Sequence, residues 1–273
     1  MFLPNKIDLG CSEKYILSIR IKADSFMFSI TDPENDANYC FRETELAVDQ
    51  TLLENIQRIV FDFNFLTQHF RETNVVFVSS EYEIIPRHYD VSKKREAMYQ
   101  FSHTENEEDI SKILMSSENV DQQTVTLYPM NKALYEFLSR SLYNPVFYHH
   151  SQLLMKCFYD KSGVVDAANR MYLYFHEKQM DVFCFSGQKL MHAIGFQEGT
   201  ERENLYYALK MWESVAFDQH NDQVFIAGRC DREIASCLKE YIRHVAAYSL
   251  PSEVFLWNGD ASKAPLDLLM LSL

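Results

Sequence analysis

Residues 15–29 read YILSIRIKADSFMFS, and residues 172–186 read YLYFHEKQMDVFCFS. Aligned without a gap, the two stretches share five residue types at an offset of 157 positions: Tyr15/Tyr172, Asp24/Asp181, Phe26/Phe183, Phe28/Phe185 and Ser29/Ser186. Each stretch alternates apolar and other residues, as strands do, on both sides of a break near the shared Asp. We therefore predict two β-hairpins and an internal duplication of the chain.

Similar patterns follow each hairpin in the same order. A third strand is expected at about 38–43 in the first half and at 190–196 in the second. A Thr-x-x-Glu capping box then predicts the start of a helix, at Thr51/Glu54 and again at Thr200/Glu203. A buried strand follows in each half, and matching Phe77 to Phe225 gives an offset of 148 there.

The remaining patterns complete each half with a helix, a fifth strand and an apolar segment. In the first half these are a helical region within about 90–116, a strand at 124–128 and a helix at 132–143. In the second half they are a helix at 232–243, a strand near 254–257 and a tail at 265–273. This order predicts the α/β class, with a mixed five-stranded sheet and helices in each half. We expect a first domain at 1–145, a connecting segment at 146–168 and a second domain at 169–273.

The charge balance bears on possible partners. The formal net charge is −13, from 26 basic and 39 acidic side chains. Nucleic-acid binding depends on Lys and Arg that neutralise phosphates, so we expect no nucleic-acid partner. One small basic cluster exists, but acidic residues interrupt it: Arg87, Lys93, Lys94 and Arg95, with Asp90 and Glu96 between and beside them.

The apolar runs and cysteines indicate a location. No apolar run reaches the ~18–20 residues that cross a bilayer, and the first residues lack a signal-peptide pattern. None of the six Cys residues forms a C-x-x-C pair, which favours reduced thiols. We expect a cytoplasmic protein without membrane insertion.

The duplicated layout resembles the actin-like ATPase superfamily, whose members carry two ribonuclease-H-like domains around a nucleotide cleft. Hexokinase-like sugar kinases and the pilus-assembly protein PilM are relatives of this type. The whole chain looks like an uncharacterised bacterial domain-of-unknown-function family with this fold. The resemblance implies two tandem ribonuclease-H-like domains, here with an insertion at about 86–120 in the first.

The same resemblance implies where ATP and magnesium would bind. The phosphate loops would be the two hairpin turns, with Asp24 and Asp181 as acids that hold magnesium. The adenosine loop would lie at Gly228, before Arg229. However, the family's Asp-x-Gly pattern is absent, because neither 22–25 nor 179–182 contains a glycine that lets the backbone approach phosphate. An Asp beside a tight turn is also explained by side-chain capping of the backbone.

Other candidate sites are weaker. His149 and His150 adjoin, but neighbours in one strand point to opposite faces, so we expect no metal site there. Cys230 and Cys237 are seven residues apart, which fits two buried thiols on a helix. The acidic run at 104–109 suits the first turn of a helix. No P-loop, G-x-S-x-G or H-E-x-x-H motif occurs in the sequence.

The sequence therefore favours a non-catalytic actin-like protein that acts as a protein-binding or scaffold module, with another protein as its partner. No confident catalytic residue and no cofactor are expected. The insertion, which carries Pro86, His88, Tyr89 and the basic cluster, is a second place where an acidic partner could bind. The alternative is a divergent ATPase or kinase that uses Asp24, Asp181 and Gly228 in the cleft between the halves.

Overall fold

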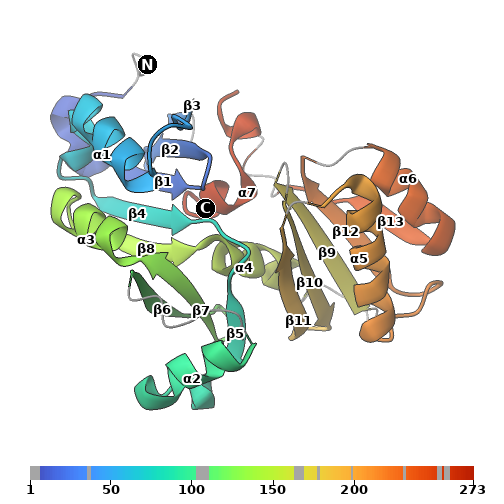
Figure 1. Ribbon diagram of the computed structural model, residues 1–273. Coiled ribbons are helices and arrows are strands. Elements are labelled where there is room, and N and C mark those ends of the chain that lie inside the picture. Colours follow the sequence, from blue (N-terminus) through green and yellow to red (C-terminus); the bar gives the residue numbers. More distant parts are fainter. Residues whose placement is uncertain are drawn as a thin grey trace.

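The computed structural model describes residues 7–35, 38–102, 111–162, 169–176, 179–197, 199–229, 232–250, 254 and 259–273. Two five-stranded sheets stand side by side, each with helices on its outer face (Figure 1). Within the described part of the chain, no helix is both long and apolar enough to span a membrane.

The first sheet has the strand order β3-β2-β1-β4-β8. Its strands are β1 (Ile16–Ile21), β2 (Ser25–Thr31), β3 (Tyr39–Glu45), β4 (Glu72–Phe77) and β8 (Val146–His149). The first three form an antiparallel meander, and β4 and β8 continue it in parallel. Helices α1 (Leu52–Asp62) and α3 (Lys132–Ser141) pack on its outer face, around a core that includes Ile19, Ile56 and Leu134.

The second sheet repeats this topology in the order β11-β10-β9-β12-β13. Its strands are β9 (Asn169–His176), β10 (Gln179–Ser186), β11 (Lys189–Phe196), β12 (Gln223–Gly228) and β13 (His244–Ala247). Helices α5 (Glu201–Ser214) and α6 (Arg232–Tyr241) cover its outer face around Leu173, Trp212 and Leu238. The predicted duplication of a mixed five-stranded α/β unit is confirmed.

Both predicted capping boxes are present. Thr51 accepts a hydrogen bond from the Glu54 amide, and the Glu54 carboxylate accepts one from the Thr51 amide at 2.8 Å. Thr200 and Glu203 repeat the arrangement at the start of α5. These reciprocal bonds satisfy amides that the first helical turn leaves without partners, so they fix where α1 and α5 begin.

The repeat, however, has a different register from the one predicted. In the first hairpin Ile21 pairs with Phe26, and in the second Phe175 pairs with Met180. These pairs are equivalent, because the carbonyl of Ile21 accepts a hydrogen bond from Val78, just after β4, and that of Phe175 accepts one from Arg229, just after β12. The hairpin offset is thus 154 (21 to 175), not 157. Side chains alternate between the faces of a strand, so an odd error exchanges the two faces. Phe26 lies on the helix side and Phe183 on the opposite side, and they are not equivalent.

The other predicted matches change for the same reason. Phe77 pairs with Ile21, and Gly228 pairs with the equivalent residue Phe175, so Phe77 corresponds to Gly228. The predicted match of Phe77 to Phe225 was wrong. Asp181 corresponds to Met27 and lies inside β10, whereas Asp24 lies in the turn between β1 and β2. The predicted pair of equivalent acids is therefore incorrect.

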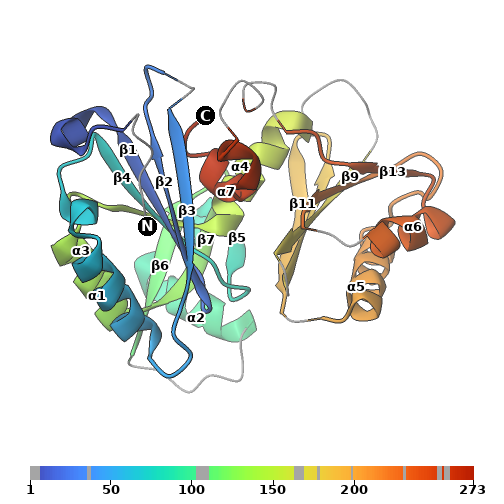
Figure 2. The same ribbon diagram turned by 90° about the horizontal axis from the view of Figure 1, so that it is seen from above.

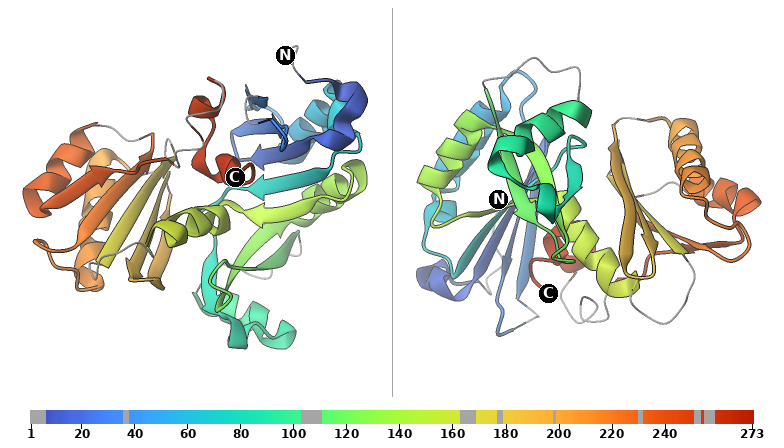
Figure 3. Two further views of the ribbon diagram at one scale, coloured as in Figure 1. Left: turned by 180° about the vertical axis from the view of Figure 1, so that it is seen from behind. Right: turned by 90° about the horizontal axis from the view of Figure 1, so that it is seen from below.

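Two fifth strands were also misplaced. Residues 124–128 belong to β7 (Thr124–Asn131), which pairs with β5 (Glu83–Pro86) and β6 (Lys112–Glu118) in a separate three-stranded sheet. With α2 (Ser92–Ser102), this sheet extends below the first one (Figure 3). The expected insertion at about 86–120 lies within this larger unit. In the second half the fifth strand is β13, not 254–257, and 255–258 lie outside the described residues.

Two helices fill the space between the sheets, which we call the seam (Figure 2). Helix α4 (His150–Ser162) follows β8 and contacts β10, and α7 (Leu266–Leu269) near the C-terminus contacts β1. Helices α4 and α7 also contact each other. The expected connecting segment 146–168 thus begins with a strand of the first sheet and continues as a seam helix. The division into domains at 145 and 169 stays a prediction. Short 3-10 helices among the described residues include Leu9–Lys14, Asn64–Thr67, Arg87–Tyr89 and Ala261–Lys263.

Candidate functional site

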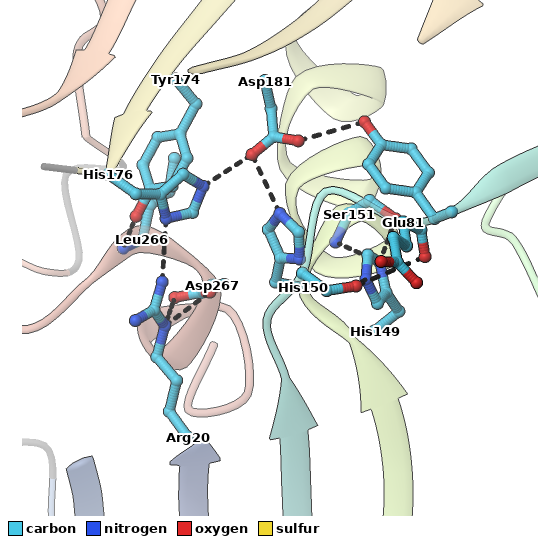
Figure 4. Close-up of polar contacts among 12 residues, drawn as sticks. Arg20, Glu81, His149, His150, Ser151, Tyr174, His176, Asp181, Leu266 and Asp267 are labelled. Carbon is cyan, nitrogen blue, oxygen red and sulfur yellow. Dashed lines mark hydrogen bonds and ion pairs between the residues drawn. The ribbon is translucent and has the colours of Figure 1, made fainter. Parts of the chain in front are cut away.

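A buried polar network lies in the seam around Asp181 (Figure 4). The Oδ2 atom of Asp181 lies 2.9 Å from Nε2 of His150 and 2.7 Å from Nε2 of His176. Its Oδ1 atom accepts a hydrogen bond from the Tyr82 hydroxyl at 3.1 Å. Tyr82 follows β4 of the first sheet and His150 begins the seam helix α4, so Asp181 joins the second sheet to both of these segments.

A second set of contacts continues from His176. The Nη2 atom of Arg20 lies 2.9 Å from Nδ1 of His176, and its Nε donates to both oxygens of Asp267 at 3.0 and 2.8 Å. The backbone amide of Leu266, beside Asp267, donates to the Tyr174 hydroxyl at 3.3 Å. Arg20 is 3% exposed and the Asp267 side chain is fully buried. Strand β1 is thereby tied to both the second sheet and α7.

The hydrogen bonds fix the tautomer of His176. A guanidinium only donates, so Nδ1 of His176 must accept from Arg20 and Nε2 must carry the proton given to Asp181. Burial lowers the pKa of His176 to about 4, which is consistent with this neutral form. For Asp181, burial alone would raise the pKa, but the neighbouring imidazoles of His150 and His176, which are hydrogen-bonded to its carboxylate, lower it well below its usual range. The site thus holds an ionised carboxylate among donors.

His149 and His150 have separate environments. His149 ends β8 and His150 begins α4; both are fully buried, with ring centroids 4.5 Å apart. His149 Nδ1 lies 2.7 Å from Ser151 Oγ, and Nε2 lies 3.3 Å from Ser79 Oγ. Burial lowers the pKa of His149 well below its usual value. The expectation that these neighbours share one strand was wrong, because the strand ends between them.

His150, His176 and Asp181 could in principle hold a metal ion, since their ligand atoms lie within 4.8 Å of one another. A His that binds metal through Nε2 carries its proton on Nδ1 and donates it to a second partner. Nδ1 of His176 faces the donor Arg20 instead, and buried Nδ1 of His150 has no partner among the described groups. The three residues therefore fit a hydrogen-bonded network better than a metal site.

A cavity of about 360 Å³ opens beside this network. The first sheet and its β1–β2 turn supply Arg20, Lys22 and Phe41, and the second half supplies His176, Gly228 and Arg229 among others. Residues 262–266, before and within α7, form a further wall. The cavity is thus lined by residues of both halves of the chain.

The predicted site residues are only partly brought together. Asp24 lies in the exposed β1–β2 turn, where its side chain is 57% exposed and pairs with Lys22 at 3.1 Å. No described contact links it to buried Asp181. Gly228 lines the cavity, but its φ is +80° and a Cβ there would collide with the carbonyl oxygen of Phe175. The strand pairing by itself requires glycine at this position.

The other candidates lie elsewhere. In the basic cluster, Arg87 pairs with Glu118 at 2.5 Å and Arg95 with Asp90 at 2.7 Å, so these two charges are matched within the small sheet unit. Cys237 is half-buried on α6. Cys230 and the acidic run at 104–109 lie outside the described residues. Tyr82 and Asp267, which complete the network, carry no motif in the sequence; only the His149–His150 doublet could have indicated it.

Comparison with known proteins gives a family and a fold. A family model described as "Protein of unknown function (DUF3822)" matches residues 4–245. No curated protein matches the sequence. A solved Bacteroides thetaiotaomicron protein with an actin-like ATPase fold and unknown function is 24% identical, with a TM-score of 0.84 over 97% of this chain and 98% of that one.

A more distant structure has the same fold. The PilM–PilN type IV pilus biogenesis complex includes a chain that is 11% identical, with a TM-score of 0.59 over 94% of this chain and 97% of that chain. At these identities the likeness concerns fold alone. The actin-like ATPase fold expected from the sequence is confirmed.

Proposed function

Because this chain belongs to the DUF3822 family of proteins of unknown function and has the actin-like ATPase fold, we propose that it is a non-catalytic module that binds another protein. The observation that carries the proposal is the position of Asp181. Its carboxylate is 2% exposed and is used by His150, His176 and Tyr82. A carboxylate held in this way is occupied with fastening the halves together, and a nucleotide-bound magnesium ion needs carboxylate oxygens that can reach it.

The hairpins and the distant relative support the same proposal. The turn at 22–25 has no glycine, and Asp181 lies within a strand instead of a phosphate-binding turn. A chain of the PilM–PilN type IV pilus biogenesis complex shares this fold, and it occurs together with a second protein. We propose a comparable role for this chain, as a cytoplasmic bacterial protein that presents a fixed surface to a protein partner.

Thermal unfolding with magnesium ATP tests the non-catalytic part of this proposal. We expect a midpoint within about 1 °C of that with magnesium chloride alone at 5 mM ligand. A ligand that binds the folded state with a Kd near 0.05 mM would add about 2.7 kcal/mol at this hundredfold excess and raise the midpoint by several degrees. Such a rise would overturn the proposal.

One observation favours the alternative, a divergent ATPase or kinase: Lys22 and Gly228 line the same cavity. In that case Asp24→Ala or Asp181→Ala would abolish nucleotide binding while the chain stays folded. Isothermal titration with magnesium ATP, alongside circular dichroism of each variant, distinguishes the two readings. Equal nucleotide binding by both variants and the unmodified chain would eliminate the proposed role of these acids.

A further inference from the structure

We propose that the seam cavity is the partner-binding site and that it receives an acidic peptide segment, with a carboxylate against its basic wall and an apolar side chain against its aromatic wall. This proposal rests on the protein-binding function above and adds the place and the chemistry of the contact. Charge complementarity, the mixed lining and the rigid walls carry it.

The charge of the wall is opposite to that of the molecule. Arg20, Lys22, Arg229 and Lys263 line the cavity, and none of its described lining residues is acidic. The chain as a whole has a formal net charge of −13. A basic cavity in an acidic protein attracts anionic groups selectively and repels further basic ones, which favours an acidic partner.

Among the described residues near the cavity, one carboxylate is shared by two cations. Asp267 holds Arg20, and Asp24 lies 3.1 Å from Lys22. Asp260 lies 2.8 Å from Arg42 and 3.9 Å from Lys263, whose side chain is 71% exposed. Since one carboxylate serves both of these cations, Lys263 can turn toward an incoming carboxylate with little loss.

Apolar groups complete the site. Phe41, Tyr174, Ile226, Tyr248 and Leu250 line the same cavity. Its volume of about 360 Å³ is at the lower end of ligand pockets, which run from about 300 to 1,000 Å³. This space suits one apolar side chain beside a charged group. The combination resembles the anchors by which short peptides dock, where an apolar residue supplies burial and polar ends supply orientation.

A metal-free anion fits this lining better than a magnesium nucleotide. Magnesium requires oxygen ligands, usually one or two carboxylates besides phosphate and water. The described wall offers cations in that place. A peptide carboxylate needs only Lys and Arg donors, which bind it with charge-assisted hydrogen bonds.

The walls are also held in place before any ligand arrives. The Arg20–Asp267 ion pair fixes β1 to α7. The Arg42–Asp260 ion pair fixes β3 to the segment that precedes α7. Asp181 joins the second sheet to the start of α4. A cavity with fixed walls loses little conformational entropy when it is filled, so even a short segment can bind measurably.

Selection from a phage-displayed library of random nine-residue peptides, on the immobilised full chain, tests the proposal. We expect enrichment of peptides with Asp or Glu next to an aromatic or aliphatic residue. Fluorescence anisotropy of the most enriched peptide, labelled with a dye, then gives its Kd. The Arg229→Glu/Lys263→Glu double variant should weaken this binding at least tenfold, and binding should also weaken as salt rises.

The matched control is Arg140→Glu/Lys239→Glu, which makes the same charge change on α3 and α6, outside the cavity lining. We expect its Kd within twofold of the unmodified chain. Lys263→Glu alone serves as a second test if the double variant unfolds. The cavity site is overturned if the selection enriches no acidic peptides, or if both double variants weaken peptide binding equally.

The outcomes also separate this inference from the protein-binding function. Peptides that still bind the cavity variant would keep a protein-binding role but place it on another surface. A selection that enriches no peptide overturns the inference. Stabilisation by magnesium ATP that the cavity variant abolishes would instead assign the cavity to a nucleotide and overturn both.

Discussion

The two hairpins are the same fold with opposite chemistry on the face that meets the seam. At matching places, 154 residues apart, the first hairpin has mainly polar and basic side chains: Ser18, Arg20, Lys22, Met27, Ser29 and Thr31. The second has mainly aromatic side chains with one acid: Tyr172, Tyr174, His176, Asp181, Phe183 and Phe185. On the helix side both are apolar, as Ile19 and Leu173 illustrate.

This difference shows which face of a duplicated sheet is free to diverge. The helix side must bury the same amphipathic helices in each half, so it keeps the same pattern. The seam faces of the two sheets contact different groups, so their side chains can become complementary to one another instead of alike. Arg20 and His176 make the complementarity visible, since a basic residue of one hairpin donates to an imidazole of the other. Three predictions break or sharpen this comparison.

The largest effect is expected from Asp267→Ala, which leaves Arg20 of the first hairpin buried without its carboxylate. Removing one member of a buried ion pair costs about 3–5 kcal/mol, because the remaining charge stays out of water. Urea unfolding followed by circular dichroism measures the loss. A replacement of both partners, Arg20→Met with Asp267→Leu, should recover most of it. A loss below about 1 kcal/mol in the single variant would show that the pair does not hold α7 on β1.

The next prediction compares the two acids that the sequence placed together. Asp181→Asn supplies one acceptor oxygen where His150, His176 and Tyr82 now donate, and its new amide donor faces donors. We expect a loss of about 2–4 kcal/mol of unfolding free energy. Asp24→Asn, on an exposed turn, should change it by less than about 0.5 kcal/mol. Similar losses in both variants would contradict the different roles assigned to the two hairpins.

Much of the fold could be predicted because it depends on local patterns. Alternation located the strands of both hairpins, and the Thr51 and Thr200 capping boxes gave the starts of α1 and α5 to the residue. Sheet membership could not be predicted in this way. Residues 124–128 have a clear strand pattern, but whether they pair with β4 or β5 depends on distant residues. Strand β13 is short and only partly apolar, so its pattern is weak.

The candidate site was predicted in part, and identity of residue type was misleading there. Asp24 and Asp181 were matched at an offset of 157, which differs from the structural offset of 154 by three residues, and an odd error exchanges the two faces of a strand. Strands β9 and β10 are buried along nearly their whole length, so alternation in the sequence did not single out one face. Tyr82 and Asp267 could not be predicted, because each reaches the network through long-range packing: Tyr82 from the loop after β4 and Asp267 from the C-terminal segment.

The third prediction concerns pH and belongs to the second hairpin. Burial lowers the pKa of His176 from 6.5 to about 4, so the folded chain keeps this ring neutral where the unfolded chain protonates it. Stability from His176 is therefore complete above pH 6.5 and is lost as pH falls toward 4, by up to about 3 kcal/mol. Buried His149 shifts in the same direction and adds to the loss.

His176→Gln isolates this contribution, because an amide can accept from Arg20 and donate to Asp181 without titrating. Urea unfolding at pH 7.5, 6.5, 5.5 and 4.5 should show a shallower decline for the variant than for the unmodified chain. Asp181 does not affect this window, because its pKa is lowered and its unfolded value of 3.8 already lies below it. The first hairpin has Lys22 in the matching place. An equal decline in both proteins would mean that the acid sensitivity of the seam does not arise from the imidazole that joins the two hairpins.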